Sequence, residues 1–206
     1  MRRLVTIVIF CTVAAMMVGC ASSPSRFYTL SPTAAQTVPP SSSYTVSVGP
    51  VTVPDVVNRL PIVLRTSPNQ VFISEFDRWA SPLKDDIARV VAGNLVSMLG
   101  TPQVTIFPQS SPADTSYRVV INILRFDSEL GKAATLDAIW TVNSAKEGKP
   151  HRGRTMLTEP TQGDDYPDLV AAHSRALGQL SAEIAGLIRE IEGRKNGDKP
   201  FRTRTE

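Results

Sequence analysis

The chain has few of the residues from which catalytic sites are built. Its two histidines, His151 and His173, have no cysteine or second histidine at ligand spacing, so the sequence does not support a zinc site. There is also no Gly-x-Ser-x-Gly nucleophile motif and no Gly-rich phosphate loop. The carboxylate pair Asp164–Asp165 precedes a predicted helix, where capping explains it. We therefore predict that the protein is not an enzyme and that it uses no metal or cofactor.

A large excess of charge of one sign is also missing. The chain has 22 Lys and Arg against 19 Asp and Glu, and loss of Arg2 and Arg3 with a signal peptide leaves the two signs nearly balanced. This balance argues against nucleic-acid binding, which requires a basic face to neutralise phosphates. Most of the remaining basic excess lies in a polar tail, 193–206. We predict that the tail is solvated, with contact to an anionic lipid surface as the alternative.

Long apolar runs are confined to the N-terminus. Leu4 to Val18 form an apolar stretch that follows two arginines and is short for a permanent membrane span, which needs about 20 residues. A positive start, a short apolar core and small residues at the end are typical of a signal peptide. The sequence Val18-Gly19-Cys20 further matches the requirement of the lipoprotein peptidase for a small residue before the cysteine. We predict that residues 1–19 are a lipoprotein signal peptide.

Cysteine is scarce. Because Cys11 lies in the signal peptide, Cys20 is the sole cysteine of the predicted mature chain, and no intramolecular disulfide can form. We predict that Cys20 carries a diacylglycerol on its sulfur and an N-acyl chain such as palmitate. The alternative is an incidental apolar residue of a membrane anchor. Since Ala21 and not an aspartate follows, the usual sorting rule predicts the periplasmic face of the outer membrane.

The segment after the anchor differs in composition from the remainder. Residues 20–43 are rich in Ser, Pro, Thr and Ala and are predicted to form a tether that holds the domain off the membrane. Arg26–Leu30 is an aromatic, β-favouring island that we expect to dock on the domain as a short strand. Residues 44–192 are predicted to form one domain.

The residue pattern of this domain predicts an α+β fold. Strands are expected over 44–53, 62–66, 71–76, 104–107, 117–126, 134–142 and 153–158. Helices are expected over 82–99, with Ser81 as N-cap and Gly100 at the C-terminal end, and over 167–191. The apolar stripes of the helices predict a two-layer sandwich, in which two long helices pack on a mainly antiparallel mixed sheet. An intermolecular coiled coil is the alternative for the last helix.

A cluster at the junction of strand and helix, Phe76–Leu83, has two interpretations. In the structural one, Trp79 covers the start of the helix and Asp77 pairs with Arg78 or with backbone donors. In the functional one, Arg78 and Trp79 bind a partner, because Arg and Trp are enriched at interface hot spots. His173 falls on the apolar stripe of the last helix, where a core or interface histidine is expected.

Four regions of the chain follow one another in a distinctive order. They are Phe27–Leu30, Val48–Pro54 followed by Leu60–Arg65, Phe76–Leu83 with the helix to Leu99, and Leu136–Trp140. Together they resemble the auxiliary lipoproteins of ABC-type transport, over essentially the whole mature chain. The first region has Phe27-Tyr28 where a Tyr pair is common in that family.

The resemblance implies a non-enzymatic docking or accessory subunit of an MCE-type intermembrane lipid transport system. Its implied partners are a periplasmic MCE-domain protein and inner-membrane transport components, with the membrane bound through the lipid anchor. One alternative is a periplasmic lipoprotein that carries or senses a lipid in a pocket between sheet and helices. A weaker alternative is an envelope hydrolase that depends on His151 or His173. A homo-oligomeric ring is a further possibility, with an exposed Trp79 and the apolar stripe of the last helix as candidate contacts.

Overall fold

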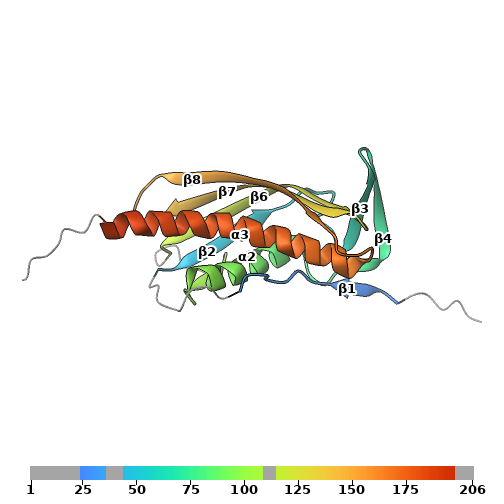
Figure 1. Cartoon of the computed structure of the whole chain (residues 1–206), viewed down its shortest axis with the longest axis horizontal. Coiled ribbons are helices and arrows are strands. Elements are labelled where there is room, and N and C mark those ends of the chain that lie inside the picture. The colour runs from blue at the N-terminus through green and yellow to red at the C-terminus, as the bar shows by residue number, and fades with distance from the viewer. Residues whose placement is uncertain (1–23, 36–43, 109–114, 198–206) are drawn as a thin grey trace, which may run out of the picture.

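The computed structural model describes residues 24–35, 44–108 and 115–197. Over these ranges the chain forms eight strands and two helices (Figure 1). The strands are β1 (Arg26–Tyr28), β2 (Val46–Thr52), β3 (Pro61–Ser67), β4 (Gln70–Trp79), β5 (Val104–Ile106), β6 (Tyr117–Glu129), β7 (Ala133–Ser144) and β8 (Pro150–Pro160). The helices are α2 (Leu83–Leu99) and α3 (Tyr166–Gly197).

All eight strands belong to one curled, mixed sheet, and the predicted α+β sandwich is confirmed. The long pairings of β6 with β7, β7 with β8 and β3 with β4 are antiparallel. The pairings of β1 with β4, and of β2 with β5 and β6, are parallel, as is the contact of β3 with β6. Because α2 lies between β2 and β6 in the chain, it supplies the crossover that a parallel pair requires.

The inner face of the sheet is built from alternate residues of the long strands. Val119 and Ile121 of β6 lie opposite Val142 and Trp140 of β7, and all four are buried, as their period-two spacing predicted. The indole Nε1 of Trp140 donates a 3.0 Å hydrogen bond to the Thr155 hydroxyl on β8, which satisfies its polar atom inside the core.

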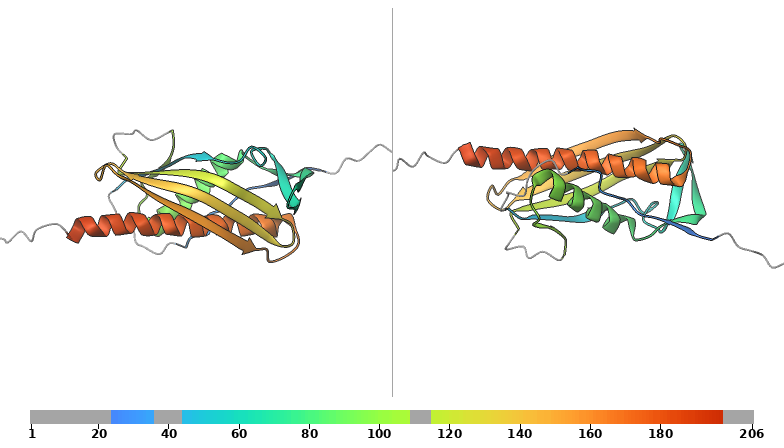
Figure 2. Two further views of the ribbon diagram at one scale, coloured as in Figure 1. Left: turned by 90° about the horizontal axis from the view of Figure 1, so that it is seen from above. Right: turned by 60° about the horizontal axis from the view of Figure 1, so that its bottom comes forward.

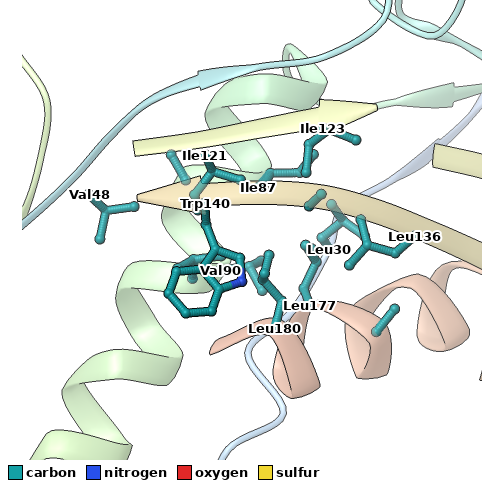
Figure 3. Packing of buried hydrophobic residues seen from close by; sticks show 14 of the residues in the cluster. Leu30, Val48, Ile87, Val90, Ile121, Ile123, Leu136, Trp140, Leu177 and Leu180 are labelled. Atoms are coloured by element: carbon teal, nitrogen blue, oxygen red, sulfur yellow. The ribbon is translucent and has the colours of Figure 1, made fainter. Parts of the chain in front are cut away.

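Both helices lie on the same face of the sheet (Figure 2). α2 buries its apolar stripe, which includes Ile87, Val90 and Leu95. The stripe of α3, including Leu177 and Leu180, is fully buried within the same chain, so the predicted packing on the sheet is confirmed. Figure 3 shows these leucines next to residues of β6 and β7.

The helix boundaries differ from the predicted ones at three of four ends. α2 begins one residue later than expected, because Pro82 and not Ser81 is the N-cap, and no side chain caps it. Its C-terminal end at Gly100 is confirmed, with a φ of 61° that favours glycine. α3 begins at Tyr166 and continues to Gly197, so the expected tail does not start at residue 193. Asp165 caps α3, since its Oδ1 accepts a 3.0 Å hydrogen bond from the Asp168 amide.

Several sequence predictions lie outside the described residues. They are the signal peptide 1–19, the lipid attachment at Cys20, residues 36–43 of the tether and the end of the tail, 198–206. Within the described ranges, no helix has the length and apolar character needed to cross a membrane.

Candidate functional site

The best candidate for a functional element is the stretch that follows the predicted lipid attachment. We call Arg26–Ala34 the N-terminal segment. Its first part is β1, which pairs in parallel with the end of β4 and places Phe27 opposite Arg78. The carbonyl of Tyr28 also accepts a 2.7 Å hydrogen bond from the Ala80 amide. The predicted docking of this stretch as a short strand is therefore confirmed.

The Asp77 carboxylate fixes the side chains of β1. It accepts hydrogen bonds from Arg26 Nε at 2.7 Å, from Tyr28 Oη at 2.8 Å and from Ser74 Oγ at 2.9 Å. Burial alone raises the pKa of the Asp77 carboxyl, but these hydrogen bonds outweigh burial and hold the pKa below its usual value. Burial and the bond to Asp77 together raise the pKa of Tyr28 to about 12. The sequence interpretation that paired Asp77 with Arg78 is wrong, because Arg26 takes that place.

A second buried carboxylate, Asp86 of α2, binds the backbone just beyond β1. Its Oδ2 accepts a 2.7 Å hydrogen bond from the Leu30 amide, and Arg89 bridges the Asp86 carboxylate and the Leu30 carbonyl. The Leu30 side chain is 0% exposed and lies among core residues that include Leu136 and Leu177 (Figure 3). The N-terminal segment therefore contributes a side chain to the hydrophobic core of the domain.

Beyond Leu30, the segment runs between the two helices. Asn94 of α2 is fully buried, and its Oδ1 accepts hydrogen bonds from the amides of Thr33 at 2.9 Å and Ala34 at 3.0 Å. On the side of α3, Ser174 Oγ accepts a 3.2 Å hydrogen bond from the Ser31 amide. These residues were expected to be part of a flexible tether. They are instead bound, because polar side chains on both helices pair with their backbone amides.

Glycines on both helices make room for the segment. A Cβ at Gly93 of α2 would lie 2.7 Å from Cγ of Pro32, which is closer than carbon atoms approach in proteins. A Cβ at Gly178 of α3 would likewise collide with the Thr33 side chain. The close approach of the segment to both helices therefore depends on the missing side chains.

The two residues proposed as partner contacts occupy different environments. The expectation that Trp79 is exposed is wrong, since its ring is 3% exposed and makes edge contacts with Phe126 and His173. Trp79 shares the buried face of β4 with Asp77, two residues earlier, so its ring points inward. Arg78 is half-buried, and its guanidinium donates to the carbonyl of Glu75 at 3.2 Å. A role for Arg78 in partner binding stays a prediction.

His173 lies in the core, as its position on the apolar stripe predicted. It is 0% exposed, stacks on Phe126 at 3.9 Å and has its Nε2 2.8 Å from Ser128 Oγ. Burial lowers its pKa to about 3, although the nearby Asp127 carboxylate opposes this shift. Within the described part of the chain His173 Nδ1 has no hydrogen-bond partner, so no carboxylate orients the ring as in a catalytic triad. With Ser128 also buried, the pair has no access to a substrate.

The other candidate groups of the sequence do not assemble into a site. In the ranges that the structure covers, no cluster of three or more His, Cys, Asp and Glu residues could hold a metal ion. His151 forms a surface contact with Glu147, with 2.7 Å between Nε2 and Oε2. A groove of about 490 Å³ lies between the N-terminal segment and the start of α3, lined in part by Phe27, Thr33 and Val170.

Comparison with known proteins identifies the family. The family model described as the ABC-type transport auxiliary lipoprotein component matches residues 28–185, which include most of the N-terminal segment and most of α3. The chain belongs to this family. The intermembrane transport lipoprotein PqiC of Escherichia coli strain K12 is 25% identical to it over 143 residues. The match spans 68% of this chain and 73% of PqiC.

Solved structures show the same fold as this auxiliary lipoprotein. A crystal structure of a protein from Xanthomonas campestris superposes with a TM-score of 0.64, covering 84% of this chain and 100% of that protein at 18% identity. A crystal structure of an uncharacterized protein gives a TM-score of 0.66, with 81% and 99% coverage and 24% identity. At these identities the likeness supports the fold alone.

The residues of this auxiliary lipoprotein that hold the N-terminal segment were not predicted from the sequence. Asp86 lies in the first turn of α2, where the helix dipole is enough to account for an acidic residue, and Asn94 was not predicted to bind anything. The signal for both was their position, since they lie eight residues apart on the apolar stripe of α2, where a polar residue needs a buried partner. The sequence gives no indication that this partner is the backbone of Leu30, Thr33 and Ala34.

Proposed function

We propose that the chain is a non-enzymatic docking subunit of an MCE-type intermembrane lipid transport system, anchored through acylated Cys20 to the periplasmic face of the outer membrane. The observation that carries the proposal is the binding of the N-terminal segment between α2 and α3. The Leu30 amide on Asp86 and the Thr33 amide on Asn94 make the stretch next to the anchor part of the fold. A lipid-anchored subunit built in this way holds its surface at a defined place relative to the membrane.

Two further findings support an accessory role. The relative PqiC is named an intermembrane transport lipoprotein, and the family consists of auxiliary components of ABC-type transport. The Ser128–His173 pair, which most resembles catalytic machinery, is buried in the core and stacked on Phe126. The proposed contribution of the protein is therefore position, because tethering raises the concentration at which its surface meets a partner.

The test is co-purification from solubilised envelopes. The full-length chain with a C-terminal tag is extracted in mild detergent, and the proteins that accompany it are identified by mass spectrometry. We expect a periplasmic MCE-domain protein and inner-membrane transport components. If no MCE-domain protein accompanies the chain, the docking proposal fails.

A matched pair of variants tests Arg78 as a contact. Arg78→Ala removes a half-buried guanidinium at the end of β4, and Arg152→Ala removes an exposed guanidinium on β8. We expect recovery of the MCE-domain protein to fall with Arg78→Ala and to remain unchanged with Arg152→Ala. Equal recovery with both variants would remove Arg78 from the partner surface.

The second candidate function is a lipoprotein that carries or senses a lipid itself. The observation that favours it is the groove of about 490 Å³ beside Phe27, Thr33 and Val170, whose lining is in part apolar. This groove lies beside the N-terminal segment, and not between sheet and helices as expected from the sequence. Native mass spectrometry of the purified chain decides between the two, because a carrier retains a non-covalent lipid in addition to the chains on Cys20.

A further inference from the structure

Exposed apolar side chains gather on the β3–β4 hairpin. Val71, Phe72 and Ile73 are consecutive residues of β4, with 38%, 52% and 44% of their surface exposed. Among the described residues this half of β4 pairs only with β3, since β1 pairs further along at residues 77–79. An apolar edge strand exposed to water is prone to aggregation unless another surface covers it.

The hairpin and the start of the N-terminal segment lie at the same end of the molecule (Figures 1 and 2). Phe27 of β1 is 63% exposed and lies at the base of β4. Leu64 of β3 pairs with Ser128 near the end of β6, which brings the β6–β7 turn, with the exposed Leu130, to this end. The last turns of α3 lie at the opposite end (Figure 1).

The length of the chain before β1 limits how far this end can lie from the membrane. Arg26 follows Cys20 after five intervening residues, so six Cα–Cα steps join the two. Fully extended, they span at most about 20 Å. The 32 residues of α3 extend over about 48 Å at the usual helical rise. Since the connection is less than half as long as the helix, the end with Phe27 and the hairpin is the one held against a membrane that contains Cys20.

Basic side chains also lie at this end of the molecule. A cavity of about 680 Å³ next to the hairpin is lined by Arg65, Arg125 and Lys132. Arg65 and Arg125 share the Asp127 carboxylate, at 3.0 and 2.6 Å, and Lys132 lies 3.8 Å from Glu129. Acidic groups lie at this end as well, since Asp164 packs against Gly131 of the β6–β7 turn and Glu75 is exposed on β4. Arginine and lysine side chains beside exposed apolar residues suit the interfacial layer of a bilayer, where basic groups meet lipid phosphates and apolar groups meet the acyl boundary.

We propose that Phe27 and Val71–Ile73 form a membrane-contact surface, which lies in the interfacial layer of the bilayer that anchors Cys20. The membrane covers the apolar edge of β4, and the long axis of the sheet points away from the bilayer. The opposite end, where α2 and α3 terminate, then faces the periplasm. This proposal rests on the acylation of Cys20 in the proposed function, but it does not depend on the MCE-type partner.

The scarcity of cysteine allows a direct test on the full acylated chain. The thioether of acylated Cys20 cannot react with thiol reagents, so an introduced cysteine is the sole free thiol after signal-peptide removal. We would compare Phe72→Cys with the control Val96→Cys, an exposed apolar position near the C-terminal end of α2. Each variant is labelled with an environment-sensitive nitrobenzoxadiazole probe. It is then reconstituted into phosphatidylethanolamine–phosphatidylglycerol vesicles containing lipids with a nitroxide near the headgroup.

We expect several-fold stronger nitroxide quenching of the probe at Phe72→Cys than at Val96→Cys. Equal quenching of the two probes overturns the proposal. The proposal is also overturned if the fluorescence of the probe at Phe72→Cys changes with the protein-to-lipid ratio but not with the nitroxide lipid. A second copy of the chain then covers the hairpin.

The outcomes separate this proposal from the proposed function. Intact mass of the purified chain establishes acylation, and a chain without acyl groups overturns both the anchor and the membrane-contact surface. Strong quenching at Phe72→Cys in a chain that recovers no MCE-domain protein supports the surface while the docking function fails. Equal quenching in an acylated chain that does recover this partner overturns the membrane-contact surface, while the docking function stands.

Discussion

The carboxylate of Asp86 accepts a 2.7 Å hydrogen bond from the backbone amide of Leu30, 56 residues earlier in the chain. Asp86 is 2% exposed and Leu30 is fully buried, so this contact lies inside the domain. It connects the stretch nearest to the predicted lipid attachment with the first turn of a helix that covers the sheet. The stability of the domain and the position of its N-terminus therefore depend on the same interaction.

Replacing Asp86 with alanine tests this dependence. Asp86→Ala leaves the buried Leu30 amide without an acceptor, and we expect the free energy of unfolding in urea to fall by about 1–3 kcal/mol. The control Asp85→Ala removes an exposed carboxylate from the same helix turn and is expected to cost about 0.5 kcal/mol, through the helix dipole alone. Equal losses in both variants would assign the effect to helix charge and not to the Leu30 contact.

The approach of the N-terminal segment to α2 can be tested by adding one methyl group. Gly93→Ala places a Cβ 2.7 Å from Pro32, and we expect faster hydrogen exchange at the amides of Thr33 and Ala34 and a less stable domain. Gly186→Ala on α3 is the control, because no atom lies within 4 Å of the added Cβ. The control should gain up to about 1 kcal/mol from helix propensity. A similar gain with Gly93→Ala would contradict the close contact with Pro32.

The buried His173 predicts acid sensitivity. Its pKa is lowered to about 3 in the folded chain, whereas an unfolded histidine titrates near ~6.5. As the pH falls, the histidine of the unfolded chain therefore takes up a proton before that of the folded chain. The free energy of unfolding is highest above pH ~6.5 and decreases as the pH falls toward 3. In urea unfolding between pH ~6.5 and ~4.5, the free energy of unfolding should fall by about 1.4 kcal/mol per pH unit, because one proton is taken up on unfolding.

Two variants assign this pH dependence to one residue. Asp77, Asp127 and Asp137 also have lowered pKa values, but unfolded aspartates titrate near ~3.9, so their contribution is lost mainly below the chosen window. His173→Gln should flatten the slope, and His151→Gln, at the start of β8, should retain it. A slope that persists in His173→Gln would show that another group takes up the proton.

The lipid anchor is tested at Cys20. Cys20→Ala should leave the circular dichroism spectrum and the urea midpoint of the domain unchanged, because the contacts that stabilise it begin at Arg26. The variant should nevertheless be lost from the outer-membrane fraction and from labelling with palmitate. We also expect it to fail to complement a strain that lacks the protein. Full complementation by an unlipidated chain would contradict the role of the anchor.

The sheet and the helices could be predicted from the sequence because their signals are local. Alternation of apolar and polar residues along Tyr117–Ile123 marks the buried face of a strand, and the spacing from Ile87 to Leu95 marks the buried face of a helix. The predicted Ser81 cap is wrong by one residue. Pro82 has a φ of −53° and a ψ of 127°, a backbone conformation outside the helix, and it takes the cap position itself.

The path of the N-terminal segment could not be predicted in the same way. Ser31 to Ala34 have the composition of a linker, and the groups that bind them, Asn94 and Ser174, lie 60 and more residues later in the chain. Pairings over such distances depend on how α2 and α3 are placed on the sheet. For the same reason the inward direction of Trp79 was missed, since its neighbours Phe126 and His173 come from other elements.

The parallel pairing of β1 with β4 has a mechanical consequence. Tension applied to Cys20 enters the domain at Arg26 and runs along β1, so the hydrogen bonds between β1 and β4 are loaded in shear and share the force. Behind them, Asp86, Asn94 and Ser174 hold the next residues across two helices. In the proposed arrangement, a pull between the membrane and a bound partner is therefore resisted by the core of the domain before the segment can peel away.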